Sequence, residues 1–158
     1  MNDHNEINGE MLNYQTMRLR DIIAEIVQCC DDRKLYESRK FGLPYSELKC
    51  LMLFLGERYL TVKGIAEKLD VAKSRVTTIL DRLIEKRFAE RIVDPKDARI
   101  KLISLTPKGK KKAEQLKDHQ RKIHGRLLLE MNNEERKNVL SHLELLRTAM
   151  EAVKEQMV

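Results

Sequence analysis

The sequence predicts a mainly α-helical protein (α+β) with one small β-hairpin. Apolar residues recur at spacings of three and four through residues 61–87, in two segments separated by a short turn, which predicts two consecutive helices. Two short segments of alternating polarity then flank a loop rich in Asp and Pro, which predicts a hairpin. Long helical patterns also cover residues 11–42 and 108–158. This order of elements predicts a winged helix-turn-helix at 43–107, with long dimerisation helices on both sides.

The first helix of the pair begins at Thr61, whose hydroxyl suits an N-cap. Residues 70–71 form the turn, and the second helix follows it. The apolar face of the first helix consists of Ile65, Ala66 and Leu69, and that of the second helix of Val76, Ile79, Leu80 and Leu83. These faces predict that the two helices pack against each other.

The opposite face of the second helix carries small hydroxyls bordered by cations near its N-terminus. Recognition helices of helix-turn-helix proteins present this end to the major groove, where hydroxyls and arginine contact base edges or phosphates. An ordinary solvated helix face would have similar charge and hydroxyl content. The residues expected to bind DNA from this helix are Lys73, Ser74, Arg75, Thr77 and Thr78.

The hairpin is predicted from strands Ala89–Val93 and Ile100–Leu105, joined by a loop that forms the wing. Lys96 lies near the tip of the loop, and Arg99 lies where the chain returns. A narrow minor groove concentrates negative potential, which attracts an inserted arginine. Asp97 could pair with Arg99 and fix its direction. The alternative is a surface hairpin with a local ion pair worth about 0–1 kcal/mol.

Residues 61–109 resemble the MarR (multiple antibiotic resistance regulator) family of bacterial and archaeal transcription factors. The matching segments are LTVKGIAEKLDVAKSRVTTILDRLIEKR, the wing sequence DPKDAR, and LISLTPKG. The resemblance extends more loosely over residues 12–156. It implies an obligate homodimer that binds a palindromic operator in double-stranded DNA. It also implies that Ser74, Arg75, Thr77 and Thr78 lie on the recognition helix, and Asp97 and Arg99 on the wing.

Two positions depart from the family pattern. Ala98 stands where the wing usually has a second arginine, which removes part of the expected wing contact. Arg87 stands where the recognition helix usually ends at a glycine. Because glycine suits the left-handed conformation of a helix C-cap, Arg87 must either adopt that conformation with some strain or extend the helix.

Positive charge is concentrated in the segment expected to bind DNA. The whole chain has a formal net charge of +6, and residues 63–112 alone hold 15 Lys and Arg against 7 Asp and Glu. This distribution favours a nucleic-acid partner, although charge alone would also suit RNA or an acidic protein. The segment ends in a basic run, which either contacts phosphates flanking the operator or forms a solvated face; its members are Lys108, Lys110, Lys111 and Lys112.

Four helix boundaries have local signals. Residues 41–44 (Phe-Gly-Leu-Pro) end the first long helix, and Ser46 is the expected N-cap of the next. Thr106 followed by proline is a strong helix start. Asn132 and Glu135 form the pattern of a capping box, which predicts the start of the last helix.

The terminal helices are expected to form the homodimer, whereas residues 1–10 are polar and predicted to be disordered. The apolar residues of the last helix repeat at spacings of 4, 3, 4 and 3, which is a heptad pattern. A small domain rarely needs so regular a stripe for its own core, so we expect a symmetric interface. A core role is the alternative for any one of the predicted dimerisation residues: Leu12, Leu19, Val139, Leu143, Leu146, Met150 and Val153.

The resemblance also implies a small-molecule effector bound between the dimerisation helices and the winged domain. Here that crevice would be lined from Ile23–Cys30, Leu48–Leu55 and the helix after Thr106. Apolar residues in these segments fit a protein core equally well. A ligand that binds one dimer geometry better than another changes DNA affinity by the difference between its two affinities.

Other function classes find little support. The sequence has no catalytic constellation, so no enzyme activity is expected, and no cofactor or metal is expected because its four histidines lack ligand spacing. No apolar segment approaches the ~20 residues that span a bilayer, and the polar N-terminus is not a signal peptide. Three cysteines indicate a reducing compartment, so we expect a cytoplasmic protein. Inert buried thiols are the default for Cys29, Cys30 and Cys50.

The predicted function is a homodimeric, sequence-specific DNA-binding transcriptional regulator, a repressor released by a small-molecule ligand. Two alternatives stay open. One is a winged-helix module that binds proteins and not DNA, and the other is a regulator that senses oxidation through its cysteines.

Overall fold

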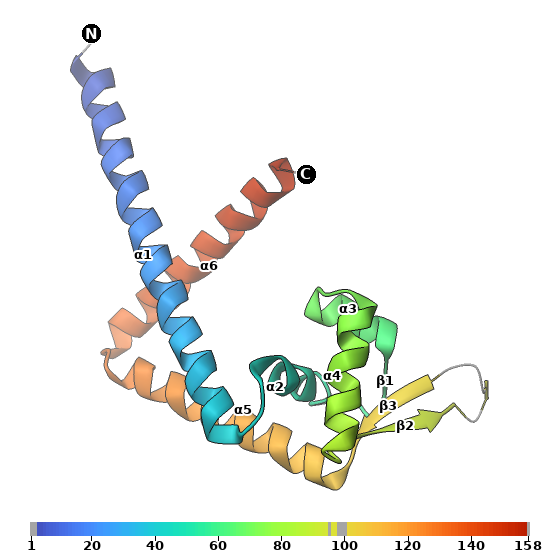
Figure 1. Ribbon diagram of the computed structural model, residues 1–158. Helices are drawn as coiled ribbons and strands as arrows, with labels where there is room; N and C mark the ends of the chain where they lie inside the picture. The colour runs from blue at the N-terminus through green and yellow to red at the C-terminus, as the bar shows by residue number, and fades with distance from the viewer. Residues whose placement is uncertain (1–2, 95, 98–100, 158) are drawn as a thin grey trace. The chain divides into compact units, whose positions relative to one another are not determined.

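The computed structural model describes residues 3–94, 96, 97 and 101–157 (Figure 1). The chain divides into two compact units, the first ending at Leu116 and the second beginning at Lys117, and helix α5 passes from one to the other. The elements are, in order, α1 (Asp3–Phe41), α2 (Tyr45–Met52), β1 (Leu60–Thr61), α3 (Val62–Leu69), α4 (Lys73–Glu85), β2 (Ala89–Val93), β3 (Lys101–Leu105), α5 (Pro107–Leu129) and α6 (Asn133–Gln156).

Helix α1 begins earlier than the sequence predicts. We expected residues 1–10 to be disordered, but the helix starts at Asp3, so that prediction is wrong from Asp3 onward. Extending an existing helix adds one hydrogen bond for each residue that is fixed, so polar residues can join a long helix once its nucleus exists. The polarity of this segment therefore does not exclude a helix.

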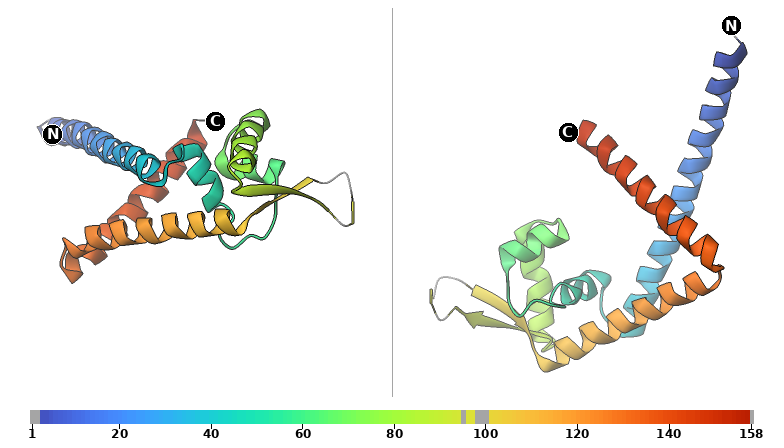
Figure 2. Two further views of the ribbon diagram at one scale, coloured as in Figure 1. Left: turned by 60° about the horizontal axis from the view of Figure 1, so that its bottom comes forward. Right: turned by 180° about the vertical axis from the view of Figure 1, so that it is seen from behind.

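The core of the first unit lies beneath the helix-turn-helix. Helices α2, α3 and α4 gather around it, and β2 and β3 project beyond α3 and α4 (Figures 1 and 2). Each large apolar side chain that is fully buried contributes about 1.5–3 kcal/mol relative to an exposed one. The fully buried apolar residues of this core include Leu48, Leu51, Ile65, Val76, Leu80, Leu83, Ile103, Ala113 and Leu116.

The predicted hairpin is confirmed, and the sheet contains one more strand. Strands β2 and β3 are antiparallel, with Ala89 opposite Leu105 and Val93 opposite Lys101. β1 pairs on the other side of β3, where Leu60 lies opposite Ile103, so the order is β1-β3-β2. A strand of two residues has no periodicity of its own, which explains why the sequence did not predict it.

The turns that end α3 and α4 share one geometry. Asp70 and Arg87 adopt the left-handed conformation, with φ of 54° and 62°. In each turn the next amide donates back into the helix, Val71 N to Ala66 O and Phe88 N to Leu83 O. This is the Schellman arrangement, and it usually places glycine at the left-handed residue. Arg87 therefore adopts the strained conformation rather than extending α4.

Most of the predicted caps are confirmed. Thr61 accepts from Gly64 N, Thr106 accepts from Gly109 N, and Asn132 and Glu135 form a complete capping box. The exception is α2, because its N-cap is Pro44 and not Ser46. Proline already holds its φ near −60° and has no N–H to satisfy, so the helix begins directly after it. In the second unit, α6 follows the turn after Leu129.

Candidate nucleic-acid interface

The N-terminal half of α4 presents a polar surface to solvent. Its buried residues, including Val76 and Ile79, face the core, and this fixes the direction of the opposite side of the helix. All five residues predicted to bind DNA from this helix are exposed: Lys73, Ser74, Arg75, Thr77 and Thr78. Lys73 is the first residue of α4, so the set spans the first two turns, as a major-groove contact requires.

Each of the two threonine hydroxyls donates a hydrogen bond to a backbone carbonyl of its own helix. Thr77 Oγ1 donates to Lys73 O at 3.1 Å, and Thr78 Oγ1 donates to Ser74 O at 3.2 Å. The hydroxyl protons are therefore used within the helix, while each hydroxyl oxygen can still accept a hydrogen bond. A lone pair can accept from the amino group of adenine or cytosine, and a methyl group packs against that of thymine.

An ion pair joins the recognition helix to the wing. Arg91 Nη2 of β2 lies 2.5 Å from Asp81 Oδ1 of α4, and both side chains are about half exposed. Exposed pairs of this kind add only about 0–1 kcal/mol, so the pair matters for charge more than for stability. It neutralises the carboxylate that lies on the same helix face as Ser74 and Thr78. The sequence did not single out Arg91, because no local pattern indicated its partner on another element.

Part of the wing lies within the described residues. Lys96 and Asp97 are exposed, and the amide of Lys96 donates to Asp94 Oδ1 at 2.7 Å. This bond is an Asx turn, in which an aspartate side chain fixes the backbone two residues later. Arg99 and its expected pairing with Asp97 lie outside the described residues, so the minor-groove contact stays a prediction.

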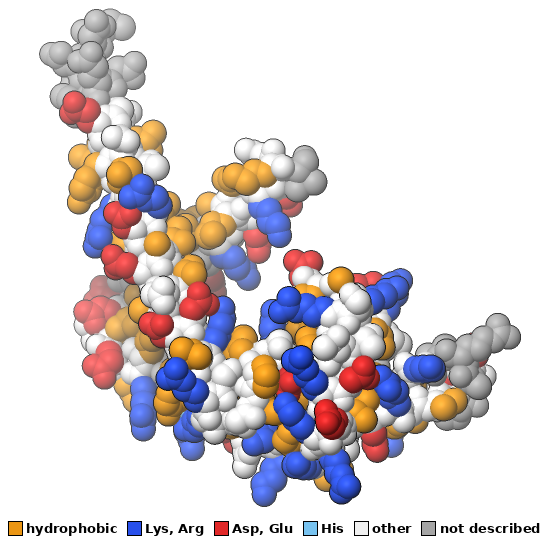
Figure 3. Space-filling view, in the orientation of Figure 1, with side chains coloured by type: hydrophobic (Ala, Val, Ile, Leu, Met, Phe, Trp, Pro, Cys, Tyr) orange, Lys and Arg blue, Asp and Glu red, His pale blue; other side chains and the backbone are white. Residues whose placement is uncertain are grey.

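Lys and Arg side chains are distributed over the helix-turn-helix and over the start of α5, with Asp and Glu among them (Figure 3). Residues 63–112, in which Lys and Arg outnumber Asp and Glu, all belong to the first unit. Such a surface attracts a phosphate backbone without selecting its sequence.

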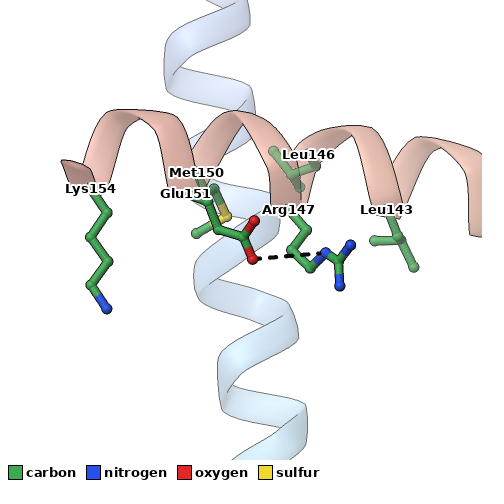
Figure 4. Close-up of a pocket in the computed structure, with 6 residues that line it drawn as sticks. All are labelled: Leu143, Leu146, Arg147, Met150, Glu151 and Lys154. Atoms are coloured by element: carbon green, nitrogen blue, oxygen red, sulfur yellow. Dashed lines mark ion pairs between the residues drawn. The ribbon is translucent and has the colours of Figure 1, made fainter. Parts of the chain in front are cut away.

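The residues predicted to form the dimer lie on exposed helix faces. Leu12 and Leu19 on α1 are exposed, as are Leu143, Met150 and Val153 on α6, while Val139 and Leu146 are half-buried. None of the residues of α6, all of which the structure describes, is buried. A pocket of about 430 Å³ lies along α6. Figure 4 shows the residues that line it, with Arg147 and Glu151 forming an ion pair. An apolar face of this length on one helix is typical of a protein interface.

Part of the lining expected for the effector crevice is buried in the core. Leu48, Cys50 and Leu51 have no exposed surface, so this part of the predicted lining belongs to the core. A different cavity, of about 390 Å³, lies within the first unit. Its wall combines three cations and a phenol with apolar side chains, and it consists of Lys34, Tyr45, Ser46, Lys49, Leu69, Val71, Arg75 and Ile79.

The three cysteines have different surroundings. Burial raises the pKa of the Cys50 thiol to about 12, with a smaller contribution from the carboxylate of Glu47. The thiolate is the reactive form, so Cys50 is protonated and unreactive at neutral pH. Cys29 is exposed and Cys30 half-buried, both on α1, so the expectation of a buried thiol is wrong for Cys29.

Metal sites and membrane-spanning helices are two other classes of site. In the described ranges no three His, Cys, Asp or Glu side chains lie together in a way that could hold a metal ion. No helix within the same ranges combines the length and the hydropathy needed to cross a membrane.

Comparison with known proteins identifies relatives of this chain. A family model described as the MarR family matches residues 41–100. The HTH-type transcriptional repressor MdtR of Bacillus subtilis (strain 168) is 30% identical over 113 residues, which cover 72% of this chain and 73% of that protein. An uncharacterised HTH-type transcriptional regulator of the same organism, YfiV, is 26% identical over 156 residues, 99% of this chain and 98% of its own.

Solved structures share the fold. The crystal structure of Streptococcus pneumoniae FabT in complex with DNA superposes with a TM-score of 0.74 at 20% identity, covering 85% of this chain and 99% of that chain. The matched family model includes α2, α3, α4 and β2, which hold the exposed face described above. With the MdtR similarity and the winged helix-turn-helix, this shows that the chain belongs to the MarR family of DNA-binding transcriptional regulators.

Proposed function

We propose that this chain forms a homodimer that binds a palindromic operator in double-stranded DNA and represses transcription until a small-molecule effector releases it. The observation that carries the proposal is the exposed set of hydroxyls and cations on the first two turns of α4, in a chain of the MarR family. Two relatives support it by their names, since MdtR is named a repressor and FabT was solved with DNA.

Base recognition is assigned to α4. Arg75 donates to guanine or to a phosphate. Ser74, Thr77 and Thr78 approach base edges with their hydroxyl oxygens, and the two threonines also with their methyl groups. A favourable base contact discriminates against the wrong base by about 1–3 kcal/mol. Lys73 and Lys96 adjust the position of the helix and the wing on the backbone. Arg99 is assigned to the minor groove, and Asp97 is assigned to fix its direction.

The palindrome follows from two-fold symmetry. One winged helix contacts about one half-site, so a symmetric pair of chains places two recognition helices at half-site centres about 10 bp apart or a multiple of that distance. The exposed apolar stripes of α1 and α6 supply the interface in this proposal. Without a partner they would leave leucine and methionine side chains in water on both terminal helices.

The effector is assigned to the cavity beside Arg75. Lys34, Lys49 and Arg75 favour an anion, and the apolar part of the wall, including Leu69 and Ile79, favours a ring or short chain. A ligand there would engage Arg75 and so compete with its DNA contact. The free energy of DNA binding then changes by the difference between the ligand's binding free energies for the free and the DNA-bound protein.

Selection of bound duplexes from a random pool tests the proposal. We expect an enriched palindrome, bound with an affinity that falls steeply as salt rises, because phosphate contacts release counterions. The selection is then repeated with aromatic carboxylates and with peroxide. Equal binding to all duplexes at physiological salt would contradict the specific function, and release by peroxide alone would favour sensing by Cys29 or Cys30.

A further inference from the structure

Two lysines of the basic run 108–112 contact the ends of other helices in the first unit, the unit that contains the winged helix-turn-helix. Helix α5 begins against this end: Thr106 Oγ1 donates to Arg87 O at 2.7 Å. At Gly109, a Cβ atom would lie 1.9 Å from the carbonyl oxygen of Phe88, so only glycine permits this approach. The first turn of α5 and the turn after α4 are therefore in direct backbone contact.

Lys108 caps the recognition helix. Its Nζ donates to the carbonyl oxygen of Lys86, the C-cap residue of α4, at 3.0 Å. The same ammonium lies 4.4 Å from the centroid of the Phe88 ring, a cation–π distance. A cation at this position offsets the negative end of the α4 dipole.

Lys112 performs the same role for a different helix. Its Nζ donates to the carbonyl oxygen of Phe41, the last residue of α1, at 3.4 Å. It also lies 5.8 Å from the centroid of the Phe88 ring and 5.9 Å from that of Phe41. Cations and rings thus alternate from the end of α4, across α5, to the end of α1, in the order Lys108, Phe88, Lys112 and Phe41.

The stability of α5 itself does not explain these lysines. The first turn of α5 has no acidic residue, and lysines near a helix N-terminus oppose the helix dipole. Lys108 and Lys112 are also four residues apart, where like charges repel. Their contacts with the ends of α4 and α1 provide the compensation. Lys108, Lys110 and Lys111 are exposed, whereas Lys112 is half-buried.

We propose, on the basis of the function proposed above, that Lys108 and Lys112 are positioning residues that hold the end of recognition helix α4 against α5 and α1. They set the specificity of operator binding through the orientation of α4, and they do not contact phosphate. The basic run therefore has two roles. Lys108 and Lys112, which contact the ends of α4 and α1, orient the helix, and Lys110 and Lys111 face solvent, where phosphate is accessible.

The test compares Lys112→Met with Lys111→Met in the full-length protein. Methionine keeps most of the apolar stem and removes the charge. For each variant, the dissociation constants for the selected operator and for an unrelated duplex of equal length are measured over a salt series. The folded fraction is measured by circular dichroism. Lys108→Met and Lys112→Arg complete the set, since arginine retains the charge and the ring contact.

Lys112→Met and Lys108→Met are expected to lower the preference for the operator by about tenfold, the order of one lost base contact, with an unchanged salt slope. Lys112→Arg and Lys111→Met should keep the preference of the wild type. A salt slope reduced by about 1, with both duplexes weakened alike, would mean that Lys112 is a phosphate contact and would overturn the inference.

Two further outcomes separate this inference from the proposed function. If the wild-type protein prefers no duplex, the proposed function fails. If it discriminates and Lys112→Met discriminates equally well, only the inference about positioning fails. A loss of affinity that matches the loss of folded protein would also overturn the inference, because the role would then be structural alone.

Discussion

The winged unit and helix α6 use apolar residues in opposite ways. In the first unit, residues such as Leu80 and Leu83 are fully buried among helices and strands of the same chain. In α6, residues at regular heptad spacing stay in contact with solvent, and Leu143 and Met150 are about half exposed. The apolar residues of the first unit are buried by the chain itself, whereas those of α6 would be buried only against a further apolar surface. The same periodicity in a sequence can therefore indicate either a core or an interface.

Glycine substitutions give the largest predicted contrast between the two regions. Gly109→Ala places a methyl group against the backbone of Phe88 and should destabilise the winged unit by about 3 kcal/mol or more. Gly125→Ala, in the second unit, meets no atom within 4 Å and should stabilise its helix by up to about 1 kcal/mol. Thermal unfolding of both variants measures the difference. Equal effects would mean that α5 is not pressed against the end of α4.

A second contrast lies on α6 itself. Leu143→Glu places a charge on the heptad stripe and should weaken self-association by about 2–4 kcal/mol, as loss of a central interface residue does. Leu145→Glu is the matched control, because Leu145 is 68% exposed and lies off the stripe. Sedimentation of both variants over a concentration range gives the dissociation constants. Association that is unchanged by Leu143→Glu would place the interface elsewhere.

Helix and wing should differ in the kind of affinity they supply. Arg75→Ala is expected to change which base is preferred at one position of each half-site, by about 1–3 kcal/mol. Arg99→Ala should weaken binding to most operators alike, through loss of minor-groove attraction. Binding to a panel of single-base operator variants separates the two effects. If Arg75→Ala weakened every sequence equally, Arg75 would be a phosphate contact.

The smallest predicted effect concerns thiol reactivity. Because the pKa of Cys50 is raised to about 12, its thiolate is scarce at pH 8, while Cys29 is exposed. A thiol reagent should label Cys29 rapidly and Cys50 only after unfolding. Mass spectrometry of the labelled native protein gives the order of reaction. Rapid labelling of native Cys50 would show that α2 opens and would revive a redox role for this residue.

Local signals predicted much of the fold. Thr61, Thr106 and Asn132 each satisfy helix-end amides within a few residues, so a cap can be recognised from a short segment. Strand β1 escaped prediction because its pairing with β3 depends on residues about forty positions away. Arg87 shows the opposite case: a residue unsuited to the left-handed conformation adopts it because the surrounding turn requires it.

Some residues of the candidate site could likewise be predicted from local patterns, and others could not. The exposed face of α4 follows from helical periodicity, so the predicted recognition residues do lie together on the surface. The partners of Lys112 do not follow from any local pattern, because Phe41 is 71 residues away in the sequence. A basic run therefore shows where positive charge lies, but only tertiary structure shows which of its members contact the ends of other helices.

We propose that two chains, joined through their terminal helices, hold two recognition helices against one palindrome. The most direct measurement is the mass of the complex with the selected operator, by sedimentation or light scattering, together with the mass of the free protein. We predict two chains in both. A stable single chain that binds the whole palindrome with full specificity would contradict the account.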